Sequence, residues 1–291
     1  MTHAHPIISI TGSSGAGTTS VKRIFELIFR REKVNAAFIE GDAFHKYDRL
    51  AMKTKVADEE ARGNPNFTHF HPDANELDIL QDVFIEYGEK GTGRTRTYVH
   101  DDEEAKLSGV SPGHFSPWRP FEANTDLLFY EGLHGCAVSD RVNLADHADL
   151  KIGVVPVINL EWIQKIHRDR STRGYSTEAV MDVILRRMPD YVRHITPQFS
   201  RTSINFQRVP IVDTSNPFIA RWIPTPDESM LVIRFANPRG IDFPYLLSMI
   251  NDSFMSRANS IVVPGNKLDL AMQLILTPLI LQLVERKRRN A

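Results

Sequence analysis

The chain has 291 residues, of which 42% are hydrophobic and 24% charged, enough to bury one sizeable core. Lys and Arg total 35 and Asp and Glu 36, so the formal net charge is -1 and no global field attracts nucleic acid or an anionic membrane. We therefore expect any anion site to be local. The single Cys136 excludes an internal disulfide framework and a multi-cysteine zinc site, which is typical of the reducing cytoplasm.

Short apolar runs alternate with amphipathic segments along most of the chain. Strands are predicted at residues 7–10, 36–39, 126–130, 150–157, 209–212 and 230–235, and helices at residues 21–29, 75–87, 160–170, 177–192 and 268–286. This order indicates an α/β fold with a mixed, largely parallel sheet and helices on both faces. Residues 48–118 have a weaker pattern and are interpreted as insertions above the sheet. A single domain over residues 1–291 is the simplest account.

The apolar stretch at residues 268–284 is long, but it is interrupted by polar residues and a proline. These are Asp269, Gln273, Thr277 and Pro278. We interpret the stretch as a buried helix and not as a membrane span.

A phosphate-binding motif follows the first predicted strand. Gly12-Ser13-Ser14-Gly15-Ala16-Gly17-Thr18-Thr19-Ser20 matches the P-loop pattern G-x-x-x-x-G-x-[ST] between a strand and a helix. Its backbone N–H groups and the helix N-terminus suit the triphosphate of ATP, and the Thr19 hydroxyl suits Mg²⁺. Thr18 stands where a P-loop usually has Lys, so the missing positive charge must come from elsewhere. The alternative is a Gly-rich turn that only links strand to helix.

Acidic residues stand at the ends of two further predicted strands. Glu131 follows an apolar run, as a Walker-B acid does, and we assign it to the metal together with Thr19. Asp42 follows the strand that we place beside the P-loop strand, and it is the candidate base that accepts the hydroxyl proton; Asp48 is a weaker rival. If this stretch is helical, His45 and Arg49 share a face with Asp42 and could hold a phosphorylated acceptor. The alternative is that Asp42 only caps a helix.

A cationic segment can supply the charge that Thr18 lacks. Lys165 and Arg168 are i, i+3 neighbours on the predicted helix, and Arg173 precedes Gly174 at its exit. A lid that presents these cations to phosphates would stabilise the transferred phosphoryl group. A solvated helix face is the alternative. Residues 93–100 and 212–217 are predicted loops that suit phosphate and sugar contacts, although turn chemistry explains them equally well.

Taken together, these residues resemble a known family. GSSGAGTTS at the P-loop, EGDAFHKYDR after the second strand, FYEGLHG at the acidic strand and INLEWIQKIHRDRSTRGY along the lid are similar to the phosphoribulokinases of proteobacteria. The resemblance continues through NPRGIDFPYL to NKLDLAMQLILTPL and so covers almost the whole chain. It implies a P-loop kinase fold like that of nucleoside-monophosphate kinases, with Mg·ATP phosphorylating O1 of D-ribulose 5-phosphate in the Calvin cycle.

The resemblance also implies residue roles. Asp42 resembles the catalytic base, Glu131 the metal-linked acid and Asp169 a second acid near the metal. Lys165 and Arg168 resemble the cationic lid. The residues that resemble ribulose 5-phosphate contacts are His45, Arg49 and Arg173.

Bacterial members of the family are homo-oligomers activated by NADH and opposed by AMP. Arg31, Arg234 and Arg257 match positions associated with that effector site. Without the resemblance, these residues are a helix-end cation and two surface arginines.

Two other functions stay open. A uridine-kinase-like enzyme would look similar around the P-loop, although the cationic lid favours a phosphorylated acceptor. A nucleotide-sensing protein that binds ATP without transferring phosphate would need no base at Asp42.

Overall fold

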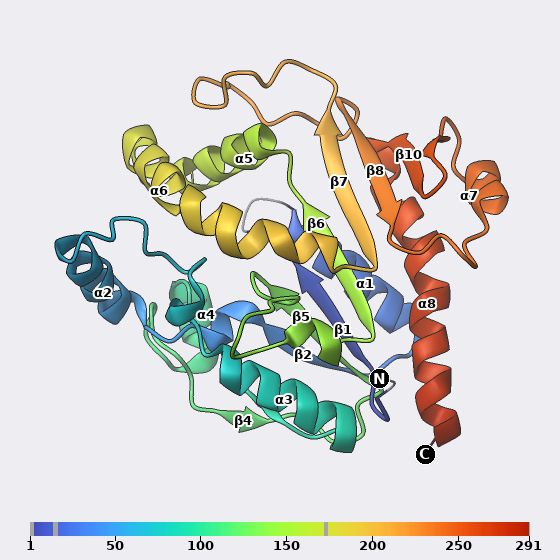
Figure 1. The fold of residues 1–291 in the computed structure, drawn as a ribbon, viewed down its shortest axis with the longest axis horizontal. Coiled ribbons are helices and arrows are strands. Elements are labelled where there is room, and N and C mark those ends of the chain that lie inside the picture. Colours follow the sequence, from blue (N-terminus) through green and yellow to red (C-terminus); the bar gives the residue numbers. More distant parts are fainter. Residues whose placement is uncertain (1–2, 14–16, 172–173, 291) are drawn as a thin grey trace.

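One sheet organises the fold, and the computed structural model describes it within residues 3–13, 17–171 and 174–290 (Figure 1). The eight strands follow the order β2-β5-β1-β6-β7-β8-β10-β9. β2, β5, β1, β6 and β7 are parallel, while β8, β10 and β9 continue the sheet antiparallel. The strands are β1 (Ile7–Thr11), β2 (Ala36–Glu40), β5 (Leu127–Gly132), β6 (Leu150–Val155), β7 (Ile204–Pro210), β8 (Ser229–Phe235), β9 (Phe254–Arg257) and β10 (Ser260–Pro264). The predicted mixed, largely parallel sheet is confirmed.

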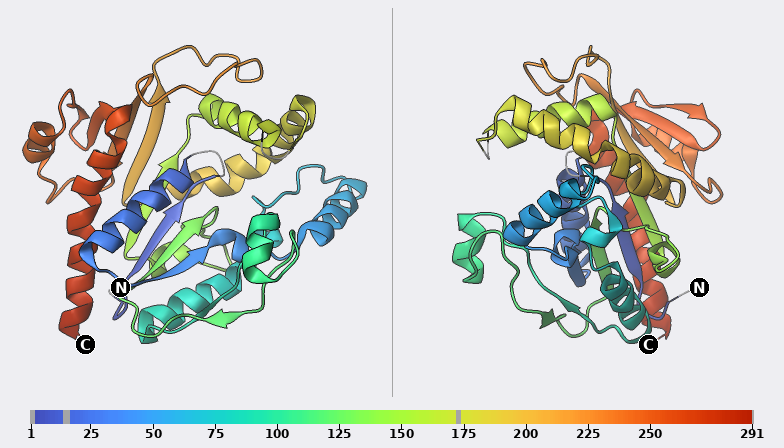
Figure 2. Two further views of the ribbon diagram at one scale, coloured as in Figure 1. Left: turned by 180° about the vertical axis from the view of Figure 1, so that it is seen from behind. Right: turned by 60° about the vertical axis from the view of Figure 1, so that its left-hand side comes forward.

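Helices cover both faces of this sheet, as predicted. Phe129 of β5 faces the core beneath α1 (Thr18–Glu32) and α8 (Leu268–Asn290), whereas Tyr130 faces the core beneath α3 (Leu77–Lys90). This division follows from the strand period of two, which sends neighbouring side chains to opposite faces. Figure 2 shows α1 and α8 from behind, together on one side of the sheet. α7 (Phe243–Met249) packs Leu246 into the same core as α8.

The C-terminal helix α8 is long and apolar enough to cross a membrane by length and composition, with 33% of its most apolar stretch buried. Met272, Leu276 and Ile280 lie fully buried in the core beside α1. α8 therefore packs along the sheet, as the prediction of a buried helix requires.

The insertion between β2 and β5 contains more structure than the sequence predicted. It holds α2 (Arg49–Ala61), α3, α4 (Asp102–Ser108) and a small ladder of β3 (Arg94–Thr95) with β4 (Arg119–Pro120). Its α3 begins two residues later and ends three residues later than the predicted helix.

Two predicted boundaries were wrong for identifiable reasons. The strand predicted at residues 209–212 is the end of β7, whose alternation of buried Ile204 and Phe206 with polar neighbours was overlooked. The helix predicted at residues 177–192 divides into α6 (Thr177–Asp190) and a π-helical turn, Tyr191–Ile195. Pro189 lacks an N–H donor, which explains why regular helical bonding stops here.

Candidate active site

The P-loop begins where β1 ends, at the same edge as the ends of β5 and β2. The Gly12 N–H donates to the Gly132 carbonyl at 3.2 Å. A Cβ at Gly12 would lie 2.8 Å from the Thr18 side chain and 3.1 Å from the Val154 backbone, so only glycine fits. Gly17 is the N-cap residue that precedes α1, and its φ of 100° lies in the left-handed region that favours glycine. The predicted order of strand, P-loop and helix is confirmed.

The P-loop residues Ser14, Gly15 and Ala16 lie outside the described residues, and so does the side chain of Thr19. Ser13 is fully buried and its Oγ has no hydrogen-bond partner. Ser20 is exposed in the first turn of α1. A buried hydroxyl without a partner at the base of the loop is consistent with a site for a polar ligand.

The acidic residue at the end of β5 lies against the P-loop. The Thr18 side chain, in the usual lysine position, lies close enough to the Glu131 carboxylate to favour its ionised form. Burial raises the pKa of Glu131 above its ordinary value, and the charge of Asp42 acts in the same direction. A carboxylate that is costly to ionise here would be stabilised by a bound cation.

The strand that carries Asp42 is not beside the P-loop strand, which corrects our expectation. β5 lies between β2 and β1, and Glu131 pairs in register with Glu40 on one side and Ile10 on the other. Asp42 lies in a 3₁₀ turn, Gly41–Phe44, that crosses the end of β5. A Cβ on Gly41 would come within 2.8 Å of the Gly132 Cα, so two glycines allow this crossing.

Two histidines face the carboxylate of Asp42, whose side chain is 42% exposed. His45 Nε2 lies 3.1 Å from Oδ1, and His100 Nε2 lies 3.3 Å from Oδ2. Burial opposes ionisation, but the hydrogen bond from His45 and the charges of His45, His100 and His69 outweigh it. They hold the pKa of Asp42 well below its ordinary value.

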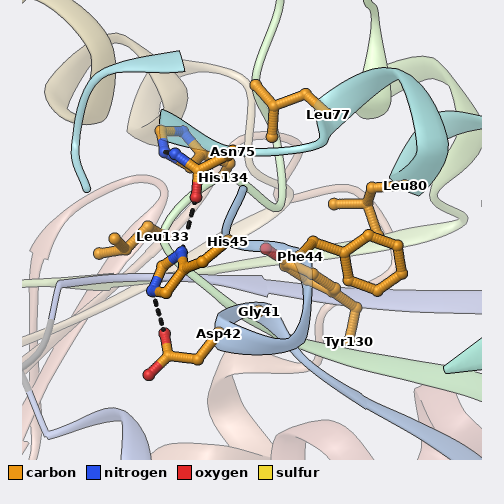
Figure 3. Close-up of a pocket in the computed structure, with 10 residues that line it drawn as sticks. All are labelled: Gly41, Asp42, Phe44, His45, Asn75, Leu77, Leu80, Tyr130, Leu133 and His134. Carbon is orange, nitrogen blue, oxygen red and sulfur yellow. Dashed lines mark hydrogen bonds and ion pairs between the residues drawn. The ribbon is translucent and has the colours of Figure 1, made fainter. Parts of the chain in front are cut away.

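A buried polar network fixes the His45 ring (Figure 3). The Asn75 Nδ2 donates to the carbonyls of His69 and His71, each at 2.9 Å, so Oδ1 must face His45 Nδ1 at 2.8 Å. His69 stacks on His45 with ring centroids 4.0 Å apart. His134 Nε2 lies 3.1 Å from Asn75 Nδ2. Figure 3 shows this chain from Asn75 through His45 to Asp42 along one pocket.

The backbone around Asp42 is held by Arg96, which sequence reasoning did not single out. Its guanidinium donates to the carbonyls of Ala43 at 2.7 Å and His45 at 2.9 Å. The same group lies 3.8 Å from the Phe115 ring centroid and 4.6 Å from that of Trp118. Arg96 therefore holds the backbone of the turn that carries Asp42.

Asp42, His45 and Arg49 do not share one helix face, because the chain is extended between the 3₁₀ turn and α2. The carboxylate of Asp48, the weaker rival base, accepts from the Ala51 N–H at 2.8 Å and caps α2. Arg49 begins α2 and donates to the His100 carbonyl at 2.7 Å. Arg49 is thus linked to the segment that carries His100.

The predicted lid helix is α5 (Ile158–Ser171), whose cations contact an acid on the same helix. Lys165 Nζ lies 2.5 Å from Asp169 Oδ2, and Arg168 Nε lies 3.0 Å from Oδ1. Burial, followed by the charge of Arg187, lowers the pKa of Lys165 to about 8, although the hydrogen bond to Asp169 opposes this. Arg173 lies outside the described residues.

A buried ion pair joins α5 to α6. Arg187 Nη2 lies 3.2 Å from Glu161 Oε1, with side chains 9% and 2% exposed. The Arg187 guanidinium also lies 4.7 Å from the Phe70 ring centroid, beside His69. Burial raises the pKa of Glu161, while the charge of Arg187 and, to a smaller extent, the nearby Ser13 side chain oppose the rise. The lid helices are therefore packed against both the P-loop and the histidine network.

The predicted effector arginines are not gathered in one place. Arg31 donates to Gln273 at 2.7 Å and Thr277 at 2.9 Å on α8. Arg234 on β8 and Arg257 on β9 flank Ser260 of β10 in register, on the face opposite α8. Within one chain, these residues lie on two sides of the sheet.

Sequence reasoning missed His69, Asn75 and His134, and placed His100 only within a loop. The network draws from segments around residues 45, 69–75, 100 and 134, so no local spacing signals it. The closely spaced His69 and His71 are the sequence feature that could have suggested a polar site in this insertion.

Known proteins have a similar sequence and a similar architecture. The family model described as Phosphoribulokinase / Uridine kinase family matches residues 7–215. The chain is 73% identical to a phosphoribulokinase of Sinorhizobium medicae, over 99% of each chain, and 72% identical to one of Nitrobacter vulgaris, over 99% of this chain and 100% of the relative.

A solved structure agrees with these sequences. The phosphoribulokinase from Rhodobacter spheroides is 67% identical, covers 98% of this chain and 99% of its own, and superposes with a TM-score of 0.90. The chain therefore belongs to the phosphoribulokinase and uridine kinase family.

Proposed function

We propose that this protein is a phosphoribulokinase, which transfers the γ-phosphoryl group of ATP to O1 of D-ribulose 5-phosphate and yields ribulose 1,5-bisphosphate for the Calvin cycle. The observation that carries the proposal is the position of Asp42, which faces two imidazoles at the edge of the sheet where the P-loop begins. High identity to phosphoribulokinases along the whole chain supports the choice of acceptor.

The residues at this edge fit Mg·ATP. Gly12 has no room for a Cβ, and Gly17 adopts a positive φ that favours glycine. The buried Ser13 hydroxyl has no hydrogen-bond partner in the protein. Glu131 would hold the metal with the Thr19 hydroxyl, and backbone N–H groups of residues 12–20 would hold phosphates. When bound, Mg·ATP supplies the phosphoryl group and part of the charge that neutralises it.

Asp42 acts on the acceptor in this proposal. Because its pKa is held low, the carboxylate stays ionised at neutral pH and can orient the O1 hydroxyl and accept its proton as the bond to phosphorus forms. His45 and His100 fix the carboxylate from two sides. His45, Arg49 and Arg173 bind the 5-phosphate and sugar hydroxyls of ribulose 5-phosphate.

The lid supplies the cation that Thr18 cannot. Lys165 and Arg168 stabilise the transferred phosphoryl group, and Asp169 holds both side chains in place and adds an acid near the metal. Burial keeps Lys165 poorly hydrated, which strengthens its attraction to a phosphate oxygen.

The same proposal includes regulation and assembly. Arg31, Arg234 and Arg257 bind NADH as an activator. Because Arg31 contacts α8 while the other two lie on the opposite face of the sheet, one site built from all three would draw on more than one chain. This supports a homo-oligomer. The formal net charge of -1 and the single Cys136 support a cytoplasmic protein with no nucleic-acid or membrane partner.

ADP release with Mg·ATP tests the function directly. Purified protein is assayed alone, with ribulose 5-phosphate and with uridine, each with and without NADH, and ³¹P NMR identifies the product. We expect release that requires ribulose 5-phosphate and increases with NADH. Release with uridine would indicate a uridine-kinase-like enzyme, and release that ignores any acceptor would indicate an ATP-binding regulator.

A further inference from the structure

A second group of side chains converges outside the proposed catalytic centre. His71 follows the histidine network, while Asp190 and His194 lie at the end of α6 and in the π-helical turn after it. One ligand atom from each residue lies within 4.8 Å of those of the other two. His194 Nε2 is 3.9 Å from Asp190 Oδ1.

Two atoms of this group are buried without a partner. Asp190 is 7% exposed, and neither its Oδ2 nor His194 Nε2 has a hydrogen-bond partner. The Thr68 amide lies beside the carboxylate, and the side chain of Arg193 is exposed. A buried oxygen and imidazole nitrogen without partners are costly, so such groups point to an ion or ligand.

The local backbone favours a cation here. Asp190 is the last residue of α6, and the helical backbone continues directly into the π-helical turn. A buried carboxylate at this position is costly to ionise without a nearby cation. The π-helical turn brings His194 back toward it, and such turns are frequent at functional sites. His71 Nδ1 lies 3.1 Å from the Asp73 N–H and 3.7 Å from the carboxylate oxygen Oδ2 of Asp73. Binding of an ion by His71 Nε2 requires the ring proton on Nδ1, where the Asp73 carboxylate can accept it.

We propose that His71, Asp190 and His194 bind one divalent cation of the zinc class. Two imidazoles and one carboxylate suit Zn²⁺, Co²⁺ or Ni²⁺, whereas Mg²⁺ prefers oxygen ligands. Ligands about 2.1 Å from one ion lie closer together than 3.9 Å when tetrahedral, so binding draws the side chains together. The ion links α6 to residues 68–75, whose Asn75 holds His45.

The test measures metal binding and not catalysis. The full chain, stripped with a chelator, is titrated with Zn²⁺ by calorimetry and with Co²⁺ by visible absorption. We expect one ion per chain, the d–d bands of a nitrogen-ligated Co²⁺, and a rise in Tm of about 5 °C with Zn²⁺ well above its Kd. His194→Ala and Asp190→Asn should each weaken binding by at least about tenfold.

Matched variants separate this site from other histidines. His114→Ala removes an exposed imidazole from a distant loop and should bind Zn²⁺ as the wild type does. His71→Gln changes the ligand that lies outside α6 and the π-helical turn. If this variant loses Zn²⁺ binding while its circular dichroism spectrum stays unchanged, the weaker binding does not come from misfolding of α6. Stoichiometric binding that survives all three site variants, or no stoichiometric binding in the wild type, would overturn the proposal.

Discussion

At Asp42, chemistry and placement are set by different parts of the chain. The 3₁₀ turn positions the carboxylate, and the imidazoles of His45 and His100 stabilise its ionised form. Asp48, only six residues later, caps a helix and has neither contact. Two acids in one short stretch thus have different expected roles.

The pair Asp42→Asn and Asp48→Asn tests this division. Asp42→Asn keeps the size of the side chain but cannot accept a proton, so kcat should fall by about a hundredfold or more. Asp48→Asn should keep kcat, because Asn also caps a helix. Steady-state kinetics with ribulose 5-phosphate provide the measurement. A near wild-type kcat for Asp42→Asn would remove Asp42 as the base.

Asn75 is expected to act through His45. Its amide is oriented by two backbone carbonyls and therefore directs Oδ1 at one nitrogen of the imidazole, which leaves the other for Asp42. Asn75→Leu has a similar volume but cannot orient the ring. We expect kcat/KM for ribulose 5-phosphate to fall at least about tenfold. This is the factor that corresponds to the loss of one hydrogen bond to a charged group.

The control for Asn75 is the same substitution at an exposed position, Asn251→Leu, which should be silent. The KM for ATP and the pH profile of kcat/KM separate a lost ring orientation from general unfolding. An altered KM for ATP with an unaltered pH profile would contradict the role of Asn75 in positioning His45.

At the scale of elements, the lid depends on one buried ion pair. Glu161 of α5 and Arg187 of α6 are each almost fully buried, and removal of one partner leaves the other charged in the interior. Arg187→Met should lower the free energy of unfolding by about 3–5 kcal/mol, whereas Glu161→Leu with Arg187→Met should recover much of it. Urea unfolding of both single variants and the double variant measures this. A loss in the double variant equal to the sum of the two single losses would show that the pair is not coupled.

The crossing of the 3₁₀ turn over β5 depends on backbone contact. Gly41→Ala places a Cβ 2.8 Å from the Gly132 Cα, and backbone atoms cannot move aside as a flexible side chain would. The turn must shift, and Asp42 with it, so kcat should fall by about a hundredfold, the usual cost of a displacement near 1 Å. Gly63→Ala is the control for backbone strain without a steric contact, because Gly63 has φ 87° and its Cβ would meet no atom within 4 Å. Full activity of Gly41→Ala would show that the turn accommodates a Cβ without displacing Asp42.

For the whole molecule, buried histidines make stability depend on pH. Burial lowers the pKa of His69 to about 3 and that of His134 to about 4, so both stay neutral in the folded protein while the unfolded chain takes up protons below about pH 6.5. Stability is therefore lost as pH falls from 6.5 toward these values. Asp42, with its depressed pKa, adds a further loss below about pH 4.

Urea unfolding at pH 7.5 and pH 5.0 measures this loss. We expect it to be on the order of 2 kcal/mol per buried imidazole at pH 5. His134→Gln keeps a donor but cannot titrate, so its loss between the two pH values should be smaller. The same dependence in wild type and variant would assign the effect to other groups.

The parts of the fold that the sequence predicted are those with local patterns. The order of β1, P-loop and α1 and the apolar run of β5 before Glu131 each lie within one short segment. The order of β5 between β1 and β2 depends on crossovers that no spacing reports, and for this reason Asp42 was placed beside the wrong strand. β9 and β10 escaped prediction because they are only 4 and 5 residues long.

The candidate site divides in the same way. Glu131 and Asp42 were predicted as site residues because an acid at the end of an apolar run is a local signal. Asn75, His134 and Arg96 were not, since their roles come from contacts with residues 30 to 59 positions away. Such roles are visible only after folding.

Thr18 in the usual lysine position also bears on how readily water could hydrolyse ATP in place of the acceptor. A P-loop with its own lysine keeps the activating charge at the phosphates at all times. In the proposed mechanism the charge is carried by Lys165 and Arg168 of α5, which packs against α6 through the Glu161–Arg187 pair. We expect a cation placed on a separate element to act on the phosphates only when that element is correctly positioned, so hydrolysis of ATP by water without a sugar phosphate should be slow.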